Sequence, residues 1–167
     1  MKAHDPDPGA SLEVCRALGA DDHGEIVQRD TYFAVTHGGL KLRDEQPGRP
    51  HLIQFERASE SQQRESRDRI IEVSDATVLC AALAAAIGIR GIVVKRRHLL
   101  LWQTVRIHLD QVEQLGTFIE LEAVAPPDSD LAHEHQLVAE LRAALGITDE
   151  RLIAIGYAEQ LHRAGRW

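Results

Sequence analysis

The chain has 167 residues, 44% of them hydrophobic, which is enough for one globular domain with a buried core over 1–167. Its formal net charge of −7 supplies no overall positive field, so a general nucleic-acid binder is excluded. The sequence contains neither an apolar run of about 18 residues nor a secretory signal pattern, and we therefore expect no membrane partner and a cytoplasmic location.

Turn and capping residues divide the chain into predicted elements. The first three residues are too few for a useful element before the helix-breaking stretch 4–9. Thereafter Gly and Pro residues separate helical from β-type stretches. In chain order these stretches predict a helix over 12–18, strands over 26–35, 40–43, 52–57 and 68–73, a helix over 74–87, strands over 91–101, 104–110 and 117–124, and helices over 130–145 and 149–162. The polar stretch 59–65 is expected to be a mobile loop.

Capping signals are clearest for the first two predicted helices. Ser11 is the expected N-cap of the first helix, and Ser74 or Asp75 that of the second, which Gly88 ends. The alanine-rich body of the second helix, residues 81–86, makes it narrow enough to lie close on a sheet.

Charged and apolar residues alternate along several predicted strands. Successive strand residues face opposite sides, so Lys41 and Arg43 share one face whereas Leu40 and Leu42 share the other. Later strands repeat this separation, with the charged residues Lys95, Arg97, Arg106, His108, Asp110, Glu120 and Glu122. We expect the amphipathic helices to cover the apolar faces.

The charged faces allow two interpretations. One is a solvated outer face held by cross-strand ion pairs. The other is a sheet that curls with its charged face inward and forms a lumen, where isolated charges would be costly and a polyanion with a divalent metal would fit. Lys and Arg neutralise phosphates, and Glu120 and Glu122, two apart on one strand, can point at one Mg²⁺ or Mn²⁺ ion. The number of strands with this pattern favours the lumen.

Four segments resemble a known family. They are QRDTYF over 28–33, LKLR over 40–43, VRIHLDQVE over 105–113 and GTFIELE over 116–122. Together they resemble the CYTH group, which comprises class IV adenylate cyclases, thiamine triphosphatases and related triphosphate tunnel metalloenzymes. The resemblance covers about residues 10–160, is strongest for the class IV adenylate cyclase-like branch, and is most specific over 105–122.

The resemblance implies an α+β fold, with an antiparallel eight-stranded β-barrel (a triphosphate tunnel) and covering helices. It implies binding of ATP or another organic or inorganic triphosphate with Mg²⁺ or Mn²⁺. The residues expected to bind the triphosphate are Lys2, Lys41, Arg43, Arg57, Arg69, Lys95, Arg97 and Arg106. The residues expected to bind the metal are Glu113, Glu120 and Glu122.

The start of the sequence departs from the family pattern. The family opens with a strand bearing Glu-x-Glu-x-Lys, and here Lys2 and Ala3 look like the end of that strand without its two glutamates. The expected barrel therefore has a truncated first strand, whose open edge makes a homodimer an expected partner state. Two functions stay open: an adenylate cyclase-like or triphosphatase enzyme, and a catalytically weak or inactive polyphosphate- or nucleotide-binding module.

Several other residues are interpreted as structural. We expect packing roles for Cys15 and Cys80 as buried thiols in a reducing compartment, and for Trp102 at a hairpin end. Tyr157 is expected in the core, and His98 is expected to be a strand residue with no further role.

Overall fold

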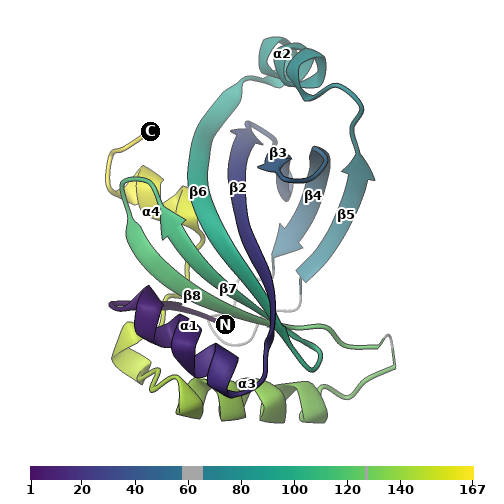
Figure 1. Cartoon of the computed structure of the whole chain (residues 1–167). Coiled ribbons are helices and arrows are strands. Elements are labelled where there is room, and N and C mark those ends of the chain that lie inside the picture. The colour runs from purple at the N-terminus through teal and green to yellow at the C-terminus, as the bar shows by residue number, and fades with distance from the viewer. Residues whose placement is uncertain (58–65, 127) are drawn as a thin grey trace. The chain divides into compact units, whose positions relative to one another are not determined.

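The computed structural model describes residues 1–57, 66–126 and 128–167. The predicted loop over 59–65 therefore lies outside the described residues. Within the described ranges, eight antiparallel strands form one sheet, in the order β1-β8-β7-β6-β2-β3-β4-β5, and four α-helices accompany it (Figure 1). The predicted α+β class with eight antiparallel strands is confirmed.

The elements follow the predicted order, with several shifted ends. The strands are β1 Lys2–His4, β2 Asp21–Phe33, β3 Gly39–Gln46, β4 His51–Arg57, β5 Ser66–Glu72, β6 Ile89–Trp102, β7 Val105–Val112 and β8 Gly116–Ala123. The helices are α1 Pro8–Ala17, α2 Ala76–Ile87, α3 Ala132–Ala144 and α4 Tyr157–Arg163, with a 3-10 turn at Asp149–Arg151.

Contacts between residues divide the chain into two compact units. Unit 1 comprises Met1–Glu25, Arg97–Gln111 and Gly116–Ala154, and unit 2 comprises Ile26–Arg96, Val112–Leu115 and Ile155–Trp167. The division falls within the long strands β2 and β6, so each of these strands contributes residues to both units. The single domain expected over 1–167 stays a prediction.

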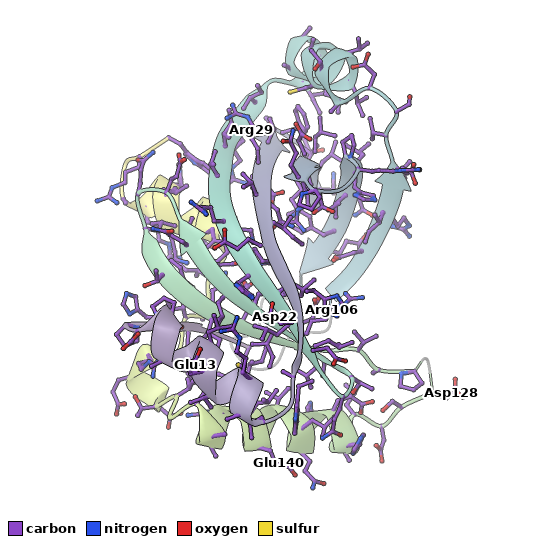
Figure 2. All side chains as sticks on the ribbon, in the orientation of Figure 1. Glu13, Asp22, Arg29, Arg106, Asp128 and Glu140 are labelled. Carbon is purple, nitrogen blue, oxygen red and sulfur yellow. The ribbon has the colours of Figure 1, made fainter. Side chains whose placement is uncertain are left out.

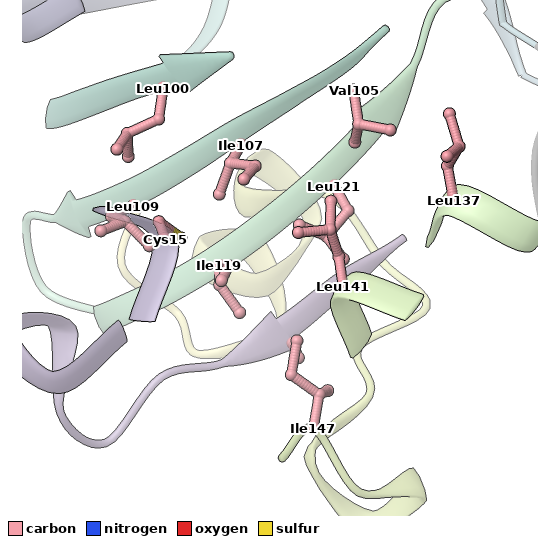
Figure 3. Close-up of a cluster of buried hydrophobic side chains, with 11 residues drawn as sticks. Cys15, Leu100, Val105, Ile107, Leu109, Ile119, Leu121, Leu137, Leu141 and Ile147 are labelled. Carbon is pink, nitrogen blue, oxygen red and sulfur yellow. The ribbon is translucent and has the colours of Figure 1, made fainter. Parts of the chain in front are cut away.

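Unit 1 contains a core of aliphatic side chains that lies between strands and helices (Figure 3). The alternation predicted for β7 places Val105, Ile107 and Leu109 in this core, and Leu137 and Leu141 of α3 pack against them. Helices α1 and α3 both contact β8 (Figure 1). The expectation that helices cover the apolar strand faces is therefore confirmed in unit 1, where each fully buried Leu or Ile contributes about 1.5–3 kcal/mol.

Strand β1 corrects the expectation that the first three residues are too few for an element. Lys2 pairs with Glu120 and Ala3 with Ile119 in antiparallel register, and Ala3 is completely buried. A strand of three residues is stable here because β8 supplies the backbone hydrogen bonds and the core receives the methyl group of Ala3.

Helix α1 begins earlier than predicted. Its N-cap is Asp7, whose Oδ1 accepts a hydrogen bond of 3.0 Å from the Ala10 N–H, and Pro8 occupies the first turn. Proline suits this position because its missing N–H would have had no partner in the helix. The predicted N-cap, Ser11, is instead buried inside the helix and donates to Asp5 Oδ1 at 3.0 Å.

Unit 2 contains the antiparallel series β2 to β5. Asp30 lies opposite Arg43, Tyr32 opposite Lys41, and Lys41 also opposite Ile53 on β4. Helix α2 follows, with Asp75 as N-cap and Gly88 after its last residue, as predicted. Helix α2 contacts β3, and none of residues 76–87, all of them described, is buried. Figure 1 shows α2 beyond the ends of β5 and β6.

The last predicted helix, 149–162, is interrupted. Residues Asp149–Arg151 form a 3-10 turn, after which Leu152 bridges Ala3 and the Ile153 N–H donates to the Lys2 carbonyl at 2.9 Å. Backbone pairing with β1 holds this segment extended, and α4 begins only at Tyr157.

Two further expectations concern the environment of the chain. In its described part, no helix combines the length and the apolar character that crossing a membrane requires. Strands β1 and β5 end the order of the sheet, and the expected homodimer stays a prediction.

We predict that Ile107→Ala lowers the free energy of unfolding by about 2–5 kcal/mol, because Ile107 is fully buried and the smaller side chain leaves a cavity. The matched control is Ile70→Ala on β5, where the side chain is 62% exposed and the loss should stay below about 1 kcal/mol. Urea unfolding measures both. Equal losses would contradict the assignment of the core to the β7 face.

Candidate functional site

In unit 2, one buried carboxylate holds two cations from the neighbouring strand. Asp30 on β2 accepts hydrogen bonds from Lys41 Nζ at 2.9 Å and from Arg43 Nε and Nη2 at 2.8 and 2.7 Å. The antiparallel register produces this arrangement, since Arg43 lies directly opposite Asp30 and Lys41 is two residues away on the same face. The contact to Arg43 is a bidentate fork.

Lys95 of β6 adds a third positive charge to this group. It is only 3% exposed, and its ammonium lies 5.0 Å from the centre of the Tyr157 ring, a favourable cation–π contact. We call Asp30, Lys41, Arg43 and Lys95 the Asp30 cluster. Tyr157 is buried, as expected, and in addition faces a cation of this cluster.

The Asp30 cluster keeps its carboxylate ionised. Burial alone would raise the pKa of Asp30, but Lys41, Arg43 and Lys95 together hold that pKa well below its ordinary value. The sequence comparison included Asp30 in the QRDTYF segment without giving it a role. Its position two residues from Tyr32 on one strand face, opposite cations on the next strand, is the signal that could have identified it.

Two other predicted phosphate ligands of unit 2 lie elsewhere. Arg69 of β5 pairs in register with Gln54 and donates to its Oε1 at 2.7 Å. Because Gln54 lies opposite Leu40, Arg69 belongs to the other face of the sheet from Lys41. Arg57 ends β4, and its side chain lies outside the described residues.

Unit 1 contains a second set of buried charges. The Arg97 guanidinium donates to Asp110 through Nε and Nη2, both at 2.7 Å, and through Nη2 to Glu120 Oε2 at 2.8 Å. Lys2 Nζ lies 3.2 Å from the other oxygen of Glu120. Arg97 is 7% and Asp110 is 2% exposed. We call Lys2, Arg97, Asp110 and Glu120 the Glu120 cluster.

His108 lies beside this cluster, between two glutamates. Its Nδ1 is 3.6 Å from Glu120 Oε2 and its Nε2 is 4.0 Å from Glu122 Oε2. Burial, and then the positive charge of Arg97, lower the pKa of His108 against the opposing effect of Glu120. The imidazole is thereby biased toward its neutral form. The sequence pattern placed His108 on the charged face but assigned it no function.

The outermost pair of this face is more loosely held. Arg106 Nη1 lies 3.6 Å from Glu122 Oε2, and both side chains are about half exposed, at 53% and 55% (Figure 2 labels Arg106). An exposed pair of this kind contributes little to stability. Glu122 can therefore change partners at small cost.

The predicted metal ligands do not form a metal site by themselves. Across 1–57, 66–126 and 128–167, no three His, Cys, Asp or Glu side chains are placed to hold one ion. Glu113 is exposed, in the turn after β7, and belongs to unit 2. Glu120 and Glu122 lie two residues apart on β8, and the two oxygens of Glu120 contact Lys2 and Arg97.

The burial of these charges decides between the two interpretations of the strand pattern. Asp30, Lys95, Arg97, His108 and Asp110 are all buried, so they are not a solvated outer face. The sequence pattern led us to expect that buried cations on this face require an anionic partner. Carboxylates of the protein provide part of that partner, since Asp30 contacts Lys41 and Arg43, and Asp110 contacts Arg97.

The residues expected to be structural differ in their burial. Cys15 is completely buried in the unit 1 core, as expected, whereas Cys80 is only half-buried, so the expectation of a buried thiol is wrong for Cys80. Trp102 packs against that core and donates from Nε1 to the Leu18 carbonyl at 3.2 Å. His98 has a partner, since its Nε2 lies 2.5 Å from Asp22 Oδ1.

Comparisons with known proteins agree with this geometry. A sequence model of the CYTH domain matches residues 3–157, which span both compact units. The PH1012 protein of Pyrococcus horikoshii OT3 has a similar structure, with a TM-score of 0.85, 22% identity and 95% of each chain covered. Among curated protein sequences, none matches the chain.

Two candidate adenylate cyclases also have similar structures. The one from Vibrio parahaemolyticus gives a TM-score of 0.80 at 16% identity, covering 97% of this chain and 95% of the other. The one from Bacillus halodurans gives 0.57 at 12% identity, covering 96% of this chain and 94% of the other. At these identities the likeness shows a shared fold.

We predict that Asp30→Asn destabilises the protein at neutral pH by up to about 3–5 kcal/mol, because buried cations lose their carboxylate. The lowered pKa of Asp30 means that its stabilisation is fully present above the ordinary value of about 3.9. Below that pH the unfolded chain takes up a proton that folded Asp30 does not. The difference from wild type should therefore shrink as the pH falls from about 5.

Urea unfolding at several pH values measures this difference. The matched control is Asp21→Asn at the exposed start of β2, whose difference from wild type should stay small throughout. A constant gap for Asp30→Asn down to about pH 2 would show that its charge does not support the fold.

Proposed function

Because the chain belongs to the CYTH domain family, we propose that it binds a triphosphate and acts on it, as an adenylate cyclase-like enzyme or a triphosphatase. ATP and other organic or inorganic triphosphates are the proposed ligands. The observation that carries the proposal is the Asp30 cluster, in which cations from two strands gather around one carboxylate.

The charges of the Asp30 cluster favour an anionic ligand. Lys41, Arg43 and Lys95 bring three positively charged groups together around Asp30. A phosphate group binds such cations through charge-assisted hydrogen bonds.

The hydrogen-bonding capacity of the cluster fits the same ligand. A Lys ammonium has three N–H donors and an Arg guanidinium has five, the groups that phosphate oxygens accept from. Asp30 fixes the direction of Lys41 and Arg43 before a ligand arrives, which reduces the entropy lost on binding. Both side chains keep part of their surface exposed, 13% and 17%.

Glu120 and Glu122 are the residues that we propose to hold Mg²⁺ or Mn²⁺ together with phosphate oxygens. When bound, such an ion polarises a phosphoryl group and neutralises developing charge. The contribution of the protein is to orient the carboxylates: Arg97 and Lys2 direct Glu120, and His108 lies between the two glutamates.

A second candidate function is a binding module with little or no turnover. One observation favours it: both carboxylate oxygens of Glu120 already contact cations, Lys2 and Arg97. A metal ion would have to compete with these pairs. Release of pyrophosphate and phosphate from ATP and tripolyphosphate, with Mg²⁺ or Mn²⁺ present, separates an enzyme at an ordinary rate of about 10 s⁻¹ from a binding module.

For the Asp30 cluster, we predict that Lys41→Gln weakens tripolyphosphate binding by about tenfold or more, because a charge-assisted contact to phosphate is worth about 1.5–3 kcal/mol. Isothermal titration calorimetry measures the affinity, and circular dichroism verifies the fold. The control is Arg49→Gln, a 75% exposed cation of the same unit, which should change the affinity less than twofold. Unchanged binding by Lys41→Gln would place the triphosphate elsewhere.

For the carboxylates, we predict that Glu120→Gln with Glu122→Gln weakens Mn²⁺ binding about tenfold when tripolyphosphate is present. Glu140→Gln, on the exposed face of α3, is the control and should leave Mn²⁺ binding unchanged (Figure 2 labels Glu140). If the double variant loses stability but binds Mn²⁺ like wild type, these glutamates form structural ion pairs and the metal assignment is wrong.

A further inference from the structure

Unit 2 contains a cavity of about 280 Å³ with aromatic walls. Tyr32 of β2, Phe55 of β4 and Trp167 line it, together with Gly156 and residues of α4. Arg90 of β6 and three residues of α4 supply polar groups to the same cavity: Glu159, His162 and Arg163. None of these residues belongs to the triphosphate or metal ligands assigned above.

The three rings form a continuous apolar wall. Tyr32 and Trp167 have ring centres 6.0 Å apart at 49°, and Tyr32 and Phe55 have ring centres 6.4 Å apart at 84°. Both separations lie within the range of favourable aromatic pairs. The rings therefore present a surface on which another planar ring can stack.

The backbone is shaped to admit these rings. A Cβ atom at Gly91 would lie 2.0 Å from the Trp167 indole, and one at Gly39 would lie 2.1 Å from the Phe55 ring. Only glycine allows the rings to approach the strands so closely. Arg166 also donates a hydrogen bond to the Gln114 carbonyl, which ties down the segment that carries Trp167.

The aromatic cavity adjoins the Asp30 cluster. Tyr32 lies two residues after Asp30 on the same face of β2, and the ammonium of Lys41, its register partner, is 5.6 Å from the centre of the Tyr32 ring. On the other side, Gly156 of the cavity precedes Tyr157, whose ring faces Lys95. A molecule could therefore place a ring in the cavity and anionic groups on the cluster.

We propose that this cavity binds the base of a nucleoside triphosphate, which makes the ligand of the Asp30 cluster a nucleotide rather than an inorganic triphosphate. The inference rests on the proposed function. The volume lies just below the usual range of about 300–1,000 Å³ for ligand pockets, so it suits one ring system with the phosphates outside it.

The chemistry of the lining favours a base over an aliphatic group. Every base has a planar π-face that can stack on aromatic side chains, and Arg90 of the lining can add a cation–π contact. Arg163 is instead paired with Glu159, which also lines the cavity. The Nε1–H of Trp167 is buried and donates to no acceptor in the part of the chain that the structure describes. An acceptor atom on the edge of a base could accept a hydrogen bond from this N–H and so remove the cost of leaving it unpaired.

The test compares ATP with tripolyphosphate, which has no base, by isothermal titration calorimetry. Trp167→Ala removes one ring from the cavity, and Gly91→Ala displaces that ring without deleting it. We expect each variant to lower ATP affinity about tenfold and to change tripolyphosphate affinity less than twofold. Trp102→Ala is the control, since Trp102 packs in unit 1 and its loss should change neither affinity.

The outcomes separate the two proposals. If wild type and variants bind tripolyphosphate but the variants lose no ATP affinity, or lose affinity for both ligands equally, the base site is wrong and triphosphate binding stands. If wild type binds neither ligand, both proposals fail. Circular dichroism of each variant confirms the fold, and Gly91→Ala provides the result should Trp167→Ala not fold.

Discussion

Buried charge needs a partner, and this requirement organises both compact units. In unit 2 the Asp30 carboxylate stabilises Lys41 and Arg43, and in unit 1 the Arg97 guanidinium stabilises Asp110 and Glu120. All of these pairs run between neighbouring strands or across one sheet face. The cost of removing each charge from water is offset only because strand register brings its counter-charge within hydrogen-bond distance.

The same pairs prepare the protein for an anion. A cation held by a carboxylate has already lost its side-chain freedom, so a phosphate that displaces or shares its contacts meets a fixed donor. The two units differ in this respect. The Asp30 cluster contains three cations and one carboxylate, whereas the Glu120 cluster contains two cations and two carboxylates. This difference is the reason to propose phosphate binding at the Asp30 cluster and metal binding at Glu120, where the metal would compete with Lys2 and Arg97.

Tyr32 connects two kinds of recognition within unit 2. One strand face carries Asp30 for the cations and Tyr32 for the aromatic wall, and Lys41 contacts both. The charged pair of Asp30 and Arg43 is therefore separated from the Tyr32 ring by one residue along β2, Thr31. A nucleotide has the same two parts, a planar base and a chain of phosphates, joined at a short distance.

Local patterns in the sequence determined much of this protein. Alternation predicted that Val105, Ile107 and Leu109 of β7 share the apolar core face, and Gly88 predicted the end of α2. The charged strand segments, through their resemblance, indicated the family. Only the tertiary structure formed β1 against β8, gave Asp30 its role, and gathered Tyr32, Phe55 and Trp167 around one cavity. The physical reason is that caps and alternation depend on consecutive residues, whereas ion pairs and cavities depend on backbone pairing and packing between residues far apart in the chain.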